Sequence, residues 1–208
     1  MIHEFFKRLA ENNLEPETEL EYTNPFTLAV AVILSAQSTD KGVNKATKAL
    51  FEAVDSPEKM ILLGEEGLKQ YIKTIGLFNA KASNILKFSH MLVSRYRGVL
   101  PLERDLLEEF PGIGRKTANV ILTVLTDKIT FPVDTHVARV SQRLEISIHS
   151  HPLKIEKDLE DKVPEPYRKN AHHLLVLHGR YVCKAQKPKC LECVLRDICP
   201  AFNKTQNV

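Results

Sequence analysis

The segment 102–125, LERDLLEEFPGIGRKTANVILTVL, restricts the possible folds of this chain more than any other. Apolar residues recur at close to helical period on both sides of Pro111-Gly112-Ile113-Gly114. The proline stops the first helix, and the glycines adopt backbone angles that residues with a Cβ resist. The segment therefore predicts two helices joined by a tight hairpin turn.

This turn presents backbone N–H groups at the start of the second helix. Such donors, together with the positive end of the helix dipole, suit an anion, and Gly112 and Gly114 let a phosphate come close. An ordinary αα-hairpin is the simpler interpretation of the turn alone. Lys116 favours a functional one, because the dipole disfavours a cation in the first turn and a partly neutral lysine is a nucleophile. The alternative is that Lys116 pairs with the bound phosphate.

Helical periodicity extends through most of the chain, without sustained strand alternation, repeats or low-complexity tracts. The length suits one large or two small domains, and a 43% hydrophobic composition can bury a core. We therefore predict an all-α fold. Besides the hairpin, helices are expected to begin at Ile2, after Pro25, at Asp40, at Ser56-Pro57 (ended by Gly64), before Leu68 (closed by Gly76), at Asn79 (running to Gly98), at Asp134, at Pro152 and at Tyr167 (running to Tyr181).

Several polar and apolar residues have two interpretations. Asp40 and Asp134 are good N-caps, and capping is the simpler role for a lone aspartate. Leu77 and Phe78 fall in an apparent loop, where large apolar residues usually enter the core and more rarely wedge into a base stack. Three histidines in the last helix could suggest a metal, but ordinary core or surface roles are expected for His172, His173 and His178.

Charge and hydropathy exclude some classes of protein. The net charge of +3 and the pI near 8.6 indicate an acidic partner only weakly. The longest apolar run, Leu28 to Leu34, is far shorter than the roughly 20 residues of a membrane span. Glu4, Lys7 and Arg8 interrupt any signal-peptide core. We expect a soluble intracellular protein, not associated with membranes, whose thiols are reduced.

All four cysteines fall within 17 residues, as Cys183, Cys190, Cys193 and Cys199 in the spacing C-x6-C-x2-C-x5-C. A disulfide framework is not expected without a secretion signal. Four thiolates at this spacing can hold either tetrahedral zinc or an iron–sulfur cluster, of which zinc is the commoner in general.

The first loop between these cysteines, KAQKPK, is basic and has no acidic residue. Its Lys184, Lys187 and Lys189 suggest a metal used as a structural support for phosphate contacts. Solubilising an exposed loop is the other role that such a charge run commonly has.

The hairpin FPGIGRKTANV, the motif PVDTHVARV and the cysteine spacing occur here in one order. Together with LSAQSTD and YIKTIGLFNAK, they resemble the endonuclease III family of DNA glycosylases over essentially the whole chain. The resemblance implies a helix-hairpin-helix fold in two helical domains with DNA in the cleft between them. One is a helical barrel, 18–128, and the other is discontinuous, 1–17 plus 129–208, with the cluster loop 183–199.

The resemblance also implies a function, namely a monomeric DNA glycosylase/AP lyase of base excision repair. Its substrates would be duplex DNA with oxidised pyrimidines or abasic sites. Lys116 matches the nucleophile that forms a Schiff base, and Asp134 matches a carboxylate that stabilises charge on the sugar. Gln37 and Leu77 match residues that fill the gap left by the flipped nucleotide. The four cysteines match ligands of a [4Fe-4S] cluster, which raises iron–sulfur above zinc.

Three other functions remain open at this point. The related adenine-mismatch glycosylase typically lacks this lysine and has a further C-terminal domain, whereas Lys116 is present and the sequence ends nine residues after Cys199. A non-catalytic helix-hairpin-helix DNA-binding module is disfavoured by the combination of Lys116 and Asp134. A zinc-stabilised scaffold would be colourless.

Overall fold

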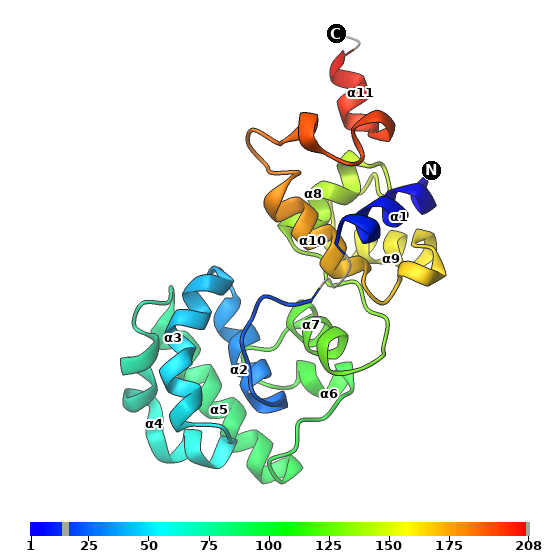
Figure 1. Ribbon diagram of the computed structural model, residues 1–208. Coiled ribbons are helices and arrows are strands. Elements are labelled where there is room, and N and C mark those ends of the chain that lie inside the picture. Colours follow the sequence, from blue (N-terminus) through cyan, green and yellow to red (C-terminus); the bar gives the residue numbers. More distant parts are fainter. Residues whose placement is uncertain (14–16, 207–208) are drawn as a thin grey trace. The chain divides into compact units, whose positions relative to one another are not determined.

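The computed structural model describes residues 1–13 and 17–206, and within these ranges its regular elements are all helices. The chain divides into two compact units: unit 1 comprises Met1–Thr18 and Asp127–Val208, and unit 2 comprises Glu19–Thr126. In Figure 1, α2 to α7 belong to unit 2, and α1 and α8 to α11 to unit 1. The all-α prediction is confirmed. No helix in the described ranges is long and apolar enough to cross a membrane.

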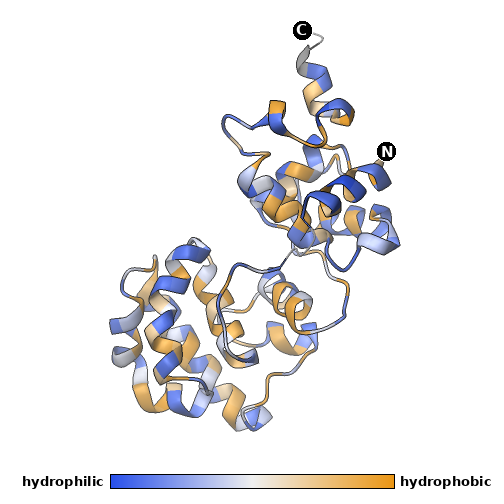
Figure 2. Cartoon of the chain, in the orientation of Figure 1, coloured by the Kyte–Doolittle hydropathy of each residue, from blue (hydrophilic) through white to orange (hydrophobic). Residues whose placement is uncertain are grey.

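Unit 2 is built around α2, in which every residue from Phe26 to Leu34 is buried. Because α2 is apolar all round, it can be covered on all sides, and α3, α5 and α7 pack against it. Figure 2 shows the hydrophobic character of α2 beside the mixed surfaces of α3 to α5. The helices of unit 2 are α2 (Pro25–Ser35), α3 (Asp40–Ala53), α4 (Pro57–Ile72), α5 (Phe78–Tyr96), α6 (Arg104–Glu108) and α7 (Arg115–Leu125).

Two predicted helix ends in unit 2 are wrong by a few residues. The N-cap of α3 is Thr39, whose hydroxyl accepts from the N–H of Gly42, so Asp40 is the first helical residue and not the cap. The predicted break at Gly64 is confirmed, because its φ of +71° and ψ of 171° separate two helical segments that α4 (Pro57–Ile72) joins across a kink. The helix ends at Ile72, and Ile75 is buried in the turn that follows.

Leu77 and Phe78, at the start of α5, were expected in a loop, where the core is the usual place for such side chains, and only Phe78 packs against it. Phe78 is the first residue of the helix and packs partly buried against the core. Leu77 is its N-cap in left-handed conformation, and 62% of its surface is exposed, so it does not enter the core.

The first helix of the hairpin is also shorter than predicted, because α6 begins only at Arg104 and leaves Leu102 exposed.

In unit 1, α1 packs its buried Phe5, Phe6 and Leu9 against α10 and the neighbouring core. The last long helix starts at Ala171, later than predicted, because a separate 3-10 turn, Glu165–Tyr167, precedes it and stacks Tyr167 on Phe6. The α-helices of unit 1 are α1 (Ile2–Asn12), α8 (Thr135–Arg143), α9 (Pro152–Lys162), α10 (Ala171–Tyr181) and α11 (Pro200–Gln206). Further 3-10 turns span Cys190–Glu192 and Arg196–Ile198.

Candidate functional site

The hairpin turn of unit 2 is fixed by packing. Phe110 and Ile113 are buried, and the N–H of Ile113 donates to the carbonyl of Phe110 at 3.0 Å. Gly112 has φ +85°, and a Cβ there would lie 3.2 Å from Cβ of Asn84 and 3.3 Å from Cγ2 of Ile33. Any other residue at this position would be strained and would crowd α2 and α5.

The second glycine of the turn has a different environment. A Cβ added at Gly114 would meet no heavy atom within 4 Å. Gly114 is the N-cap of α7 and has no side chain to satisfy the donors of the first turn. Lys116 is exposed as the second residue of this helix. The turn thus offers an open helix N-terminus with an accessible amine beside it, which suits an anion.

Gln37 and Leu77, which are 40 residues apart in sequence, lie in neighbouring turns. Both are exposed and left-handed, with φ +55° for Gln37 and +59° for Leu77. A Cβ built on Gly76 would be 3.9 Å from the carbonyl oxygen of Gln37, so the two turns lie close together. Left-handed angles are disfavoured for residues with a Cβ, and such strain is commonly retained at functional sites.

Asp134 caps α8 in unit 1, as predicted. Its Oδ1 accepts from the N–H of Val137 at 2.7 Å, and the residue is half-buried. Among the described residues, Oδ2 has no hydrogen-bonding partner. One carboxylate oxygen is thus used to hold the helix, and the other remains available. Lys116 belongs to unit 2 and Asp134 to unit 1.

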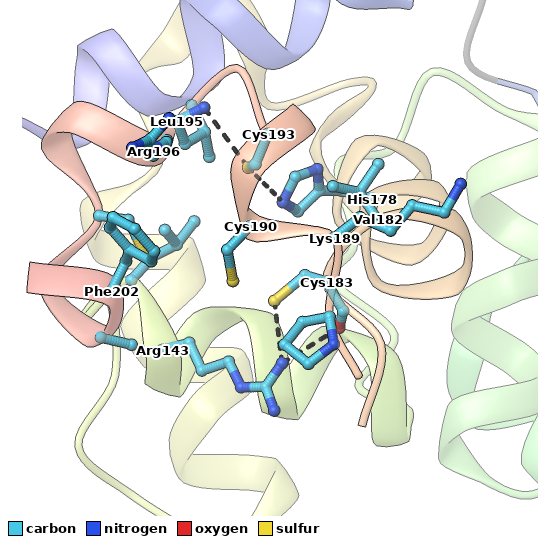
Figure 3. A pocket seen from close by; sticks show the side chains of 14 residues that line it. Arg143, His178, Val182, Cys183, Lys189, Cys190, Cys193, Leu195, Arg196 and Phe202 are labelled. Atoms are coloured by element: carbon cyan, nitrogen blue, oxygen red, sulfur yellow. Dashed lines mark hydrogen bonds between the residues drawn. The ribbon is translucent and has the colours of Figure 1, made fainter. Parts of the chain in front are cut away.

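The four cysteines are free thiols that line one cavity of about 190 Å³ in unit 1. Figure 3 shows the sulfur atoms of Cys183 and Cys190 directed into this space. No three His, Cys, Asp or Glu side chains within the described ranges are arranged to hold a single metal ion. Zinc would require the sulfur atoms to lie about 2.3 Å from one point. Four thiols that line one cavity suit a group that several cysteines ligate together, such as an iron–sulfur cluster.

The surroundings of the cavity disfavour deprotonated cysteines, so a bound cluster has to stabilise the thiolates that ligate it. Burial raises the pKa of the Cys190 and Cys193 thiols, so the protein by itself favours their protonated form. A bound metal reverses this preference, because its positive charge deprotonates a ligating thiol. The donor set therefore fits an iron–sulfur group, whose charge supplies what the cavity lacks.

Two side chains that the sequence analysis did not assign to the cavity also contact the cysteines. Arg143 of α8 donates to Sγ of Cys183 at 3.2 Å. His178 of α10 is buried with Nε2 3.7 Å from Sγ of Cys193, and burial lowers its pKa to about 4. The imidazole is therefore neutral at physiological pH. His178 has a buried role as expected, but that role is at the cavity wall (Figure 3).

Arginines on α8 join this helix to the start of the cysteine loop. Arg139 donates to the carbonyls of Cys183 at 2.9 Å and Gly179 at 2.7 Å. Arg143 donates to the carbonyl of Lys184 at 2.7 Å. The helix that Asp134 caps is therefore fixed to the loop by charge-assisted hydrogen bonds, which are stronger than neutral ones. The only sequence signal was the i, i+4 spacing of the two arginines after the PVDTH motif.

The lysines of the cysteine loop differ in their environment. Lys184, Lys187 and Lys189 are all exposed. Lys187 is held at φ +48°, and Lys189 forms an ion pair with Glu192 at 3.8 Å. Lys187 is therefore the better placed of these two for an outside anion.

Comparisons with known proteins identify the family. Residues 30–165 match the model of the HhH-GPD superfamily of base excision DNA repair proteins, and residues 183–199 match the iron–sulfur binding domain of endonuclease III. Endonuclease III of Rickettsia felis is 48% identical over 98% of this chain and 95% of the relative. That of Escherichia coli K12 is 46% identical over 94% of this chain and 93% of the relative. The chain belongs to the endonuclease III family.

Solved structures of endonuclease III have the same fold. A non-covalent endonuclease III–DNA complex superposes with a TM-score of 0.93 at 41% identity, over 100% of this chain and 97% of that one. A trapped endonuclease III–DNA covalent intermediate, an estranged-adenine complex, gives 0.92 at 40% identity, with 99% of each chain covered. As an endonuclease III family member, this protein is a DNA-binding base excision repair glycosylase with AP lyase activity and a [4Fe-4S] cluster. The predictions of family, enzyme class and cofactor are confirmed.

Proposed function

We propose that this endonuclease III family protein excises oxidised or ring-damaged pyrimidines from duplex DNA, with Lys116 as the nucleophile. The observation that carries the proposal is the exposed amine of Lys116, two residues after the open glycine turn at the start of α7. A relative that is 40% identical was trapped as a covalent intermediate with DNA, which supports an amine that bonds to the substrate.

The reaction begins with extrusion of the damaged nucleotide, because its glycosidic carbon is out of reach inside the duplex. The amine of Lys116 attacks C1′, and the C1′–base bond breaks as the base leaves with the bonding electrons. The ring oxygen O4′ takes up a proton when the sugar opens, which leaves a protonated Schiff base between Nζ and C1′. Loss of a C2′ proton then expels the 3′ phosphate by β-elimination. Water releases Lys116 from the product.

Asp134 supplies the negative charge that this sequence of steps needs. Positive charge develops on the sugar as the base departs, and a fixed carboxylate stabilises it without reorganisation. The same carboxylate can also assist proton transfer during ring opening. Oδ2 is the oxygen proposed to act, since Oδ1 accepts the capping hydrogen bond.

The remaining site residues have binding and structural roles. Gln37 and Leu77 fill the gap left by the flipped nucleotide, the exposed Leu77 side chain acting as the wedge. Gly112 and Gly114 form the turn whose N–H groups contact phosphate. Cys183, Cys190, Cys193 and Cys199 ligate the cluster, which supplies charge that holds the loop in its fold when bound. Lys184, Lys187 and Lys189 contact the DNA backbone from that loop.

We further propose that the two compact units correspond to the domains expected from the sequence, the 18–128 barrel and the discontinuous cluster domain. The protein is proposed to act as a monomer inside the cell, where its substrate is, on damaged-base or abasic duplexes.

A borohydride-trapping assay on defined duplexes tests the proposed substrate. The duplexes contain an oxidised pyrimidine, an abasic site, an adenine mismatch or no lesion. Trapped adduct is expected with the first two and not with the others. If adduct forms only with the abasic duplex, the assignment to oxidised pyrimidines is overturned, and the AP lyase activity remains supported. Excision of the mismatched adenine would favour the adenine-mismatch relative instead.

The salt dependence of binding tests the loop lysines. If Lys187 contacts a phosphate, Lys187→Ala should reduce the slope of log affinity against log salt by about 0.9. Lys189→Ala should reduce it less, because Glu192 already neutralises part of that charge. Affinity for damaged and undamaged duplexes should fall alike, since phosphate contacts carry no sequence information. Lys157→Ala, an exposed lysine on α9, is the matched control. If the slope of log affinity against log salt is unchanged in loop variants that keep their full iron content, the lysines serve only to keep the exposed loop soluble.

A further inference from the structure

Lys81 is the only buried lysine in the part of the chain that the structure describes, with 5% of its surface exposed. Burial removes water from the ammonium group and lowers its pKa, so the amine needs acceptors inside the protein. It has two, since Nζ donates to the carbonyl of Leu34 at 2.9 Å and to Oγ of Ser38 at 3.0 Å. None of the steps described above uses Lys81.

These acceptors lie at the two ends of the turn that contains Gln37. Leu34 is in the last turn of α2, where carbonyls lack intrahelical partners and the helix dipole favours a cation. Ser38 immediately precedes Thr39, the N-cap of α3. One amine therefore fixes both the exit from α2 and the entry to α3, with Gln37 between them.

The backbone of Lys81 holds the other turn. Lys81 lies one turn into α5, and its N–H donates to the carbonyl of Leu77 at 3.0 Å. Gly76, next to Leu77, lies close to the carbonyl of Gln37, which would be 3.9 Å from a Cβ added to this glycine. Lys81 is thus hydrogen-bonded to the turns of both left-handed residues, through its side chain to one and its main chain to the other.

We propose that Lys81 is a positioning residue that holds Gln37 and Leu77 together as one preformed gap-filling element. The inference rests on the proposed gap-filling role of these two residues. Left-handed angles persist at residues with a Cβ only where the surroundings enforce them. Removing the amine leaves the Gln37 turn free to relax to ordinary angles. In the variant, Gln37 then has to become ordered at each encounter with a lesion. In the wild-type protein, the preformed turn already holds it in place.

Lys81→Met tests this role, because methionine keeps length and helix propensity but removes both side-chain hydrogen bonds. Iron content and affinity for undamaged duplex should stay within about twofold of wild type. The single-turnover excision rate should fall about 10- to 100-fold, the factor expected for losing hydrogen bonds from a charged donor. Fluorescence of 2-aminopurine placed opposite the lesion should report less insertion. Lys87→Met, exposed on the same helix, is the matched control and should match wild type in every assay.

Two further variants decide the outcome if Lys81→Met folds poorly. Ser38→Ala removes one of the two bonds without touching the buried amine, and should show the same pattern with a smaller rate loss. In a Gln37→Ala background, Lys81→Met should cost much less than in wild type, because coupled residues are not additive. A wild-type rate and fluorescence signal in Ser38→Ala would overturn the proposal. If Lys81→Met loses affinity equally for damaged and undamaged duplexes, the proposal is also overturned. Lys81 then contributes to the stability of the fold alone.

Failure of the underlying assumption would look different. If Gln37→Ala and Leu77→Ala leave the 2-aminopurine signal unchanged while wild type traps abasic DNA, the gap-filling roles are wrong and Lys81 has nothing to position. If those two variants lose the signal and Lys81→Met keeps it, only the inference about Lys81 fails.

Discussion

Replacing Lys116 by alanine is expected to abolish the borohydride-trapped adduct and to lower excision by on the order of 10³-fold or more, because the proposed nucleophile is lost. The fold should survive, since Lys116 is exposed in the first turn of α7 and alanine is a good helix former. DNA affinity should change little, because the DNA contacts proposed for the glycine turn and for Lys184, Lys187 and Lys189 remain. Single-turnover kinetics, trapping yield and binding are measured on the same abasic duplex.

The control for Lys116→Ala is Lys87→Ala, which removes an exposed lysine from α5 of the same unit. It should trap as wild type does. Trapping by Lys116→Ala at the normal rate would mean that another amine is the nucleophile, and mass mapping of the adduct would identify it.

Replacing Asp134 by asparagine should lower the single-turnover rate by about 10²- to 10⁴-fold with little loss of affinity, because the proposed role of the carboxylate is to stabilise charge that develops in the transition state. Asparagine is as good an N-cap as aspartate, so its side-chain oxygen can still accept from the N–H of Val137. The substitution therefore removes the charge and keeps α8. Rates and affinities are measured with an oxidised-pyrimidine duplex, and stability by thermal unfolding.

Asp134→Ala separates the two roles of this residue. It removes the cap as well as the charge, and should cost about 1 kcal/mol of stability beyond the asparagine variant, at a similar rate. A normal rate in Asp134→Asn would limit Asp134 to capping. So would a large loss of thermal stability or affinity in that variant.

The features of the fold that were predictable are those set by local chemistry. The hairpin turn follows from Pro111 and its two glycines, and the central position of α2 follows from its apolar surface. The cap of α8 follows from the preference of helix starts for Asp134. The catalytic and DNA-binding roles came from the resemblance to a family. The spacing of the four cysteines did not decide between zinc and an iron–sulfur cluster. The match of residues 183–199 to the iron–sulfur binding domain of endonuclease III decided it.

The contacts that could not be predicted join distant segments through backbone carbonyls. Lys81 donates to Leu34 across 47 residues, and Arg139 donates to Cys183 across 44. A carbonyl acceptor leaves no mark on the sequence, because every residue has one. For Leu77 the residues alone left both a core role and a wedge open, and the resemblance favoured the wedge. Average behaviour places a large apolar side chain in the core, and the 62% exposure of Leu77 departs from that average.

The division of the chain has a consequence for its synthesis on the ribosome. Unit 2 is one uninterrupted stretch, 19–126, whereas unit 1 combines the first 18 residues with the segment from Asp127 onward. At roughly 5–20 residues per second, α10 emerges about 8 to 30 seconds after α1. During that interval the nascent chain carries Phe5, Phe6 and Leu9 without the helix that buries them. The first helix to be made is thus among the last to be packed.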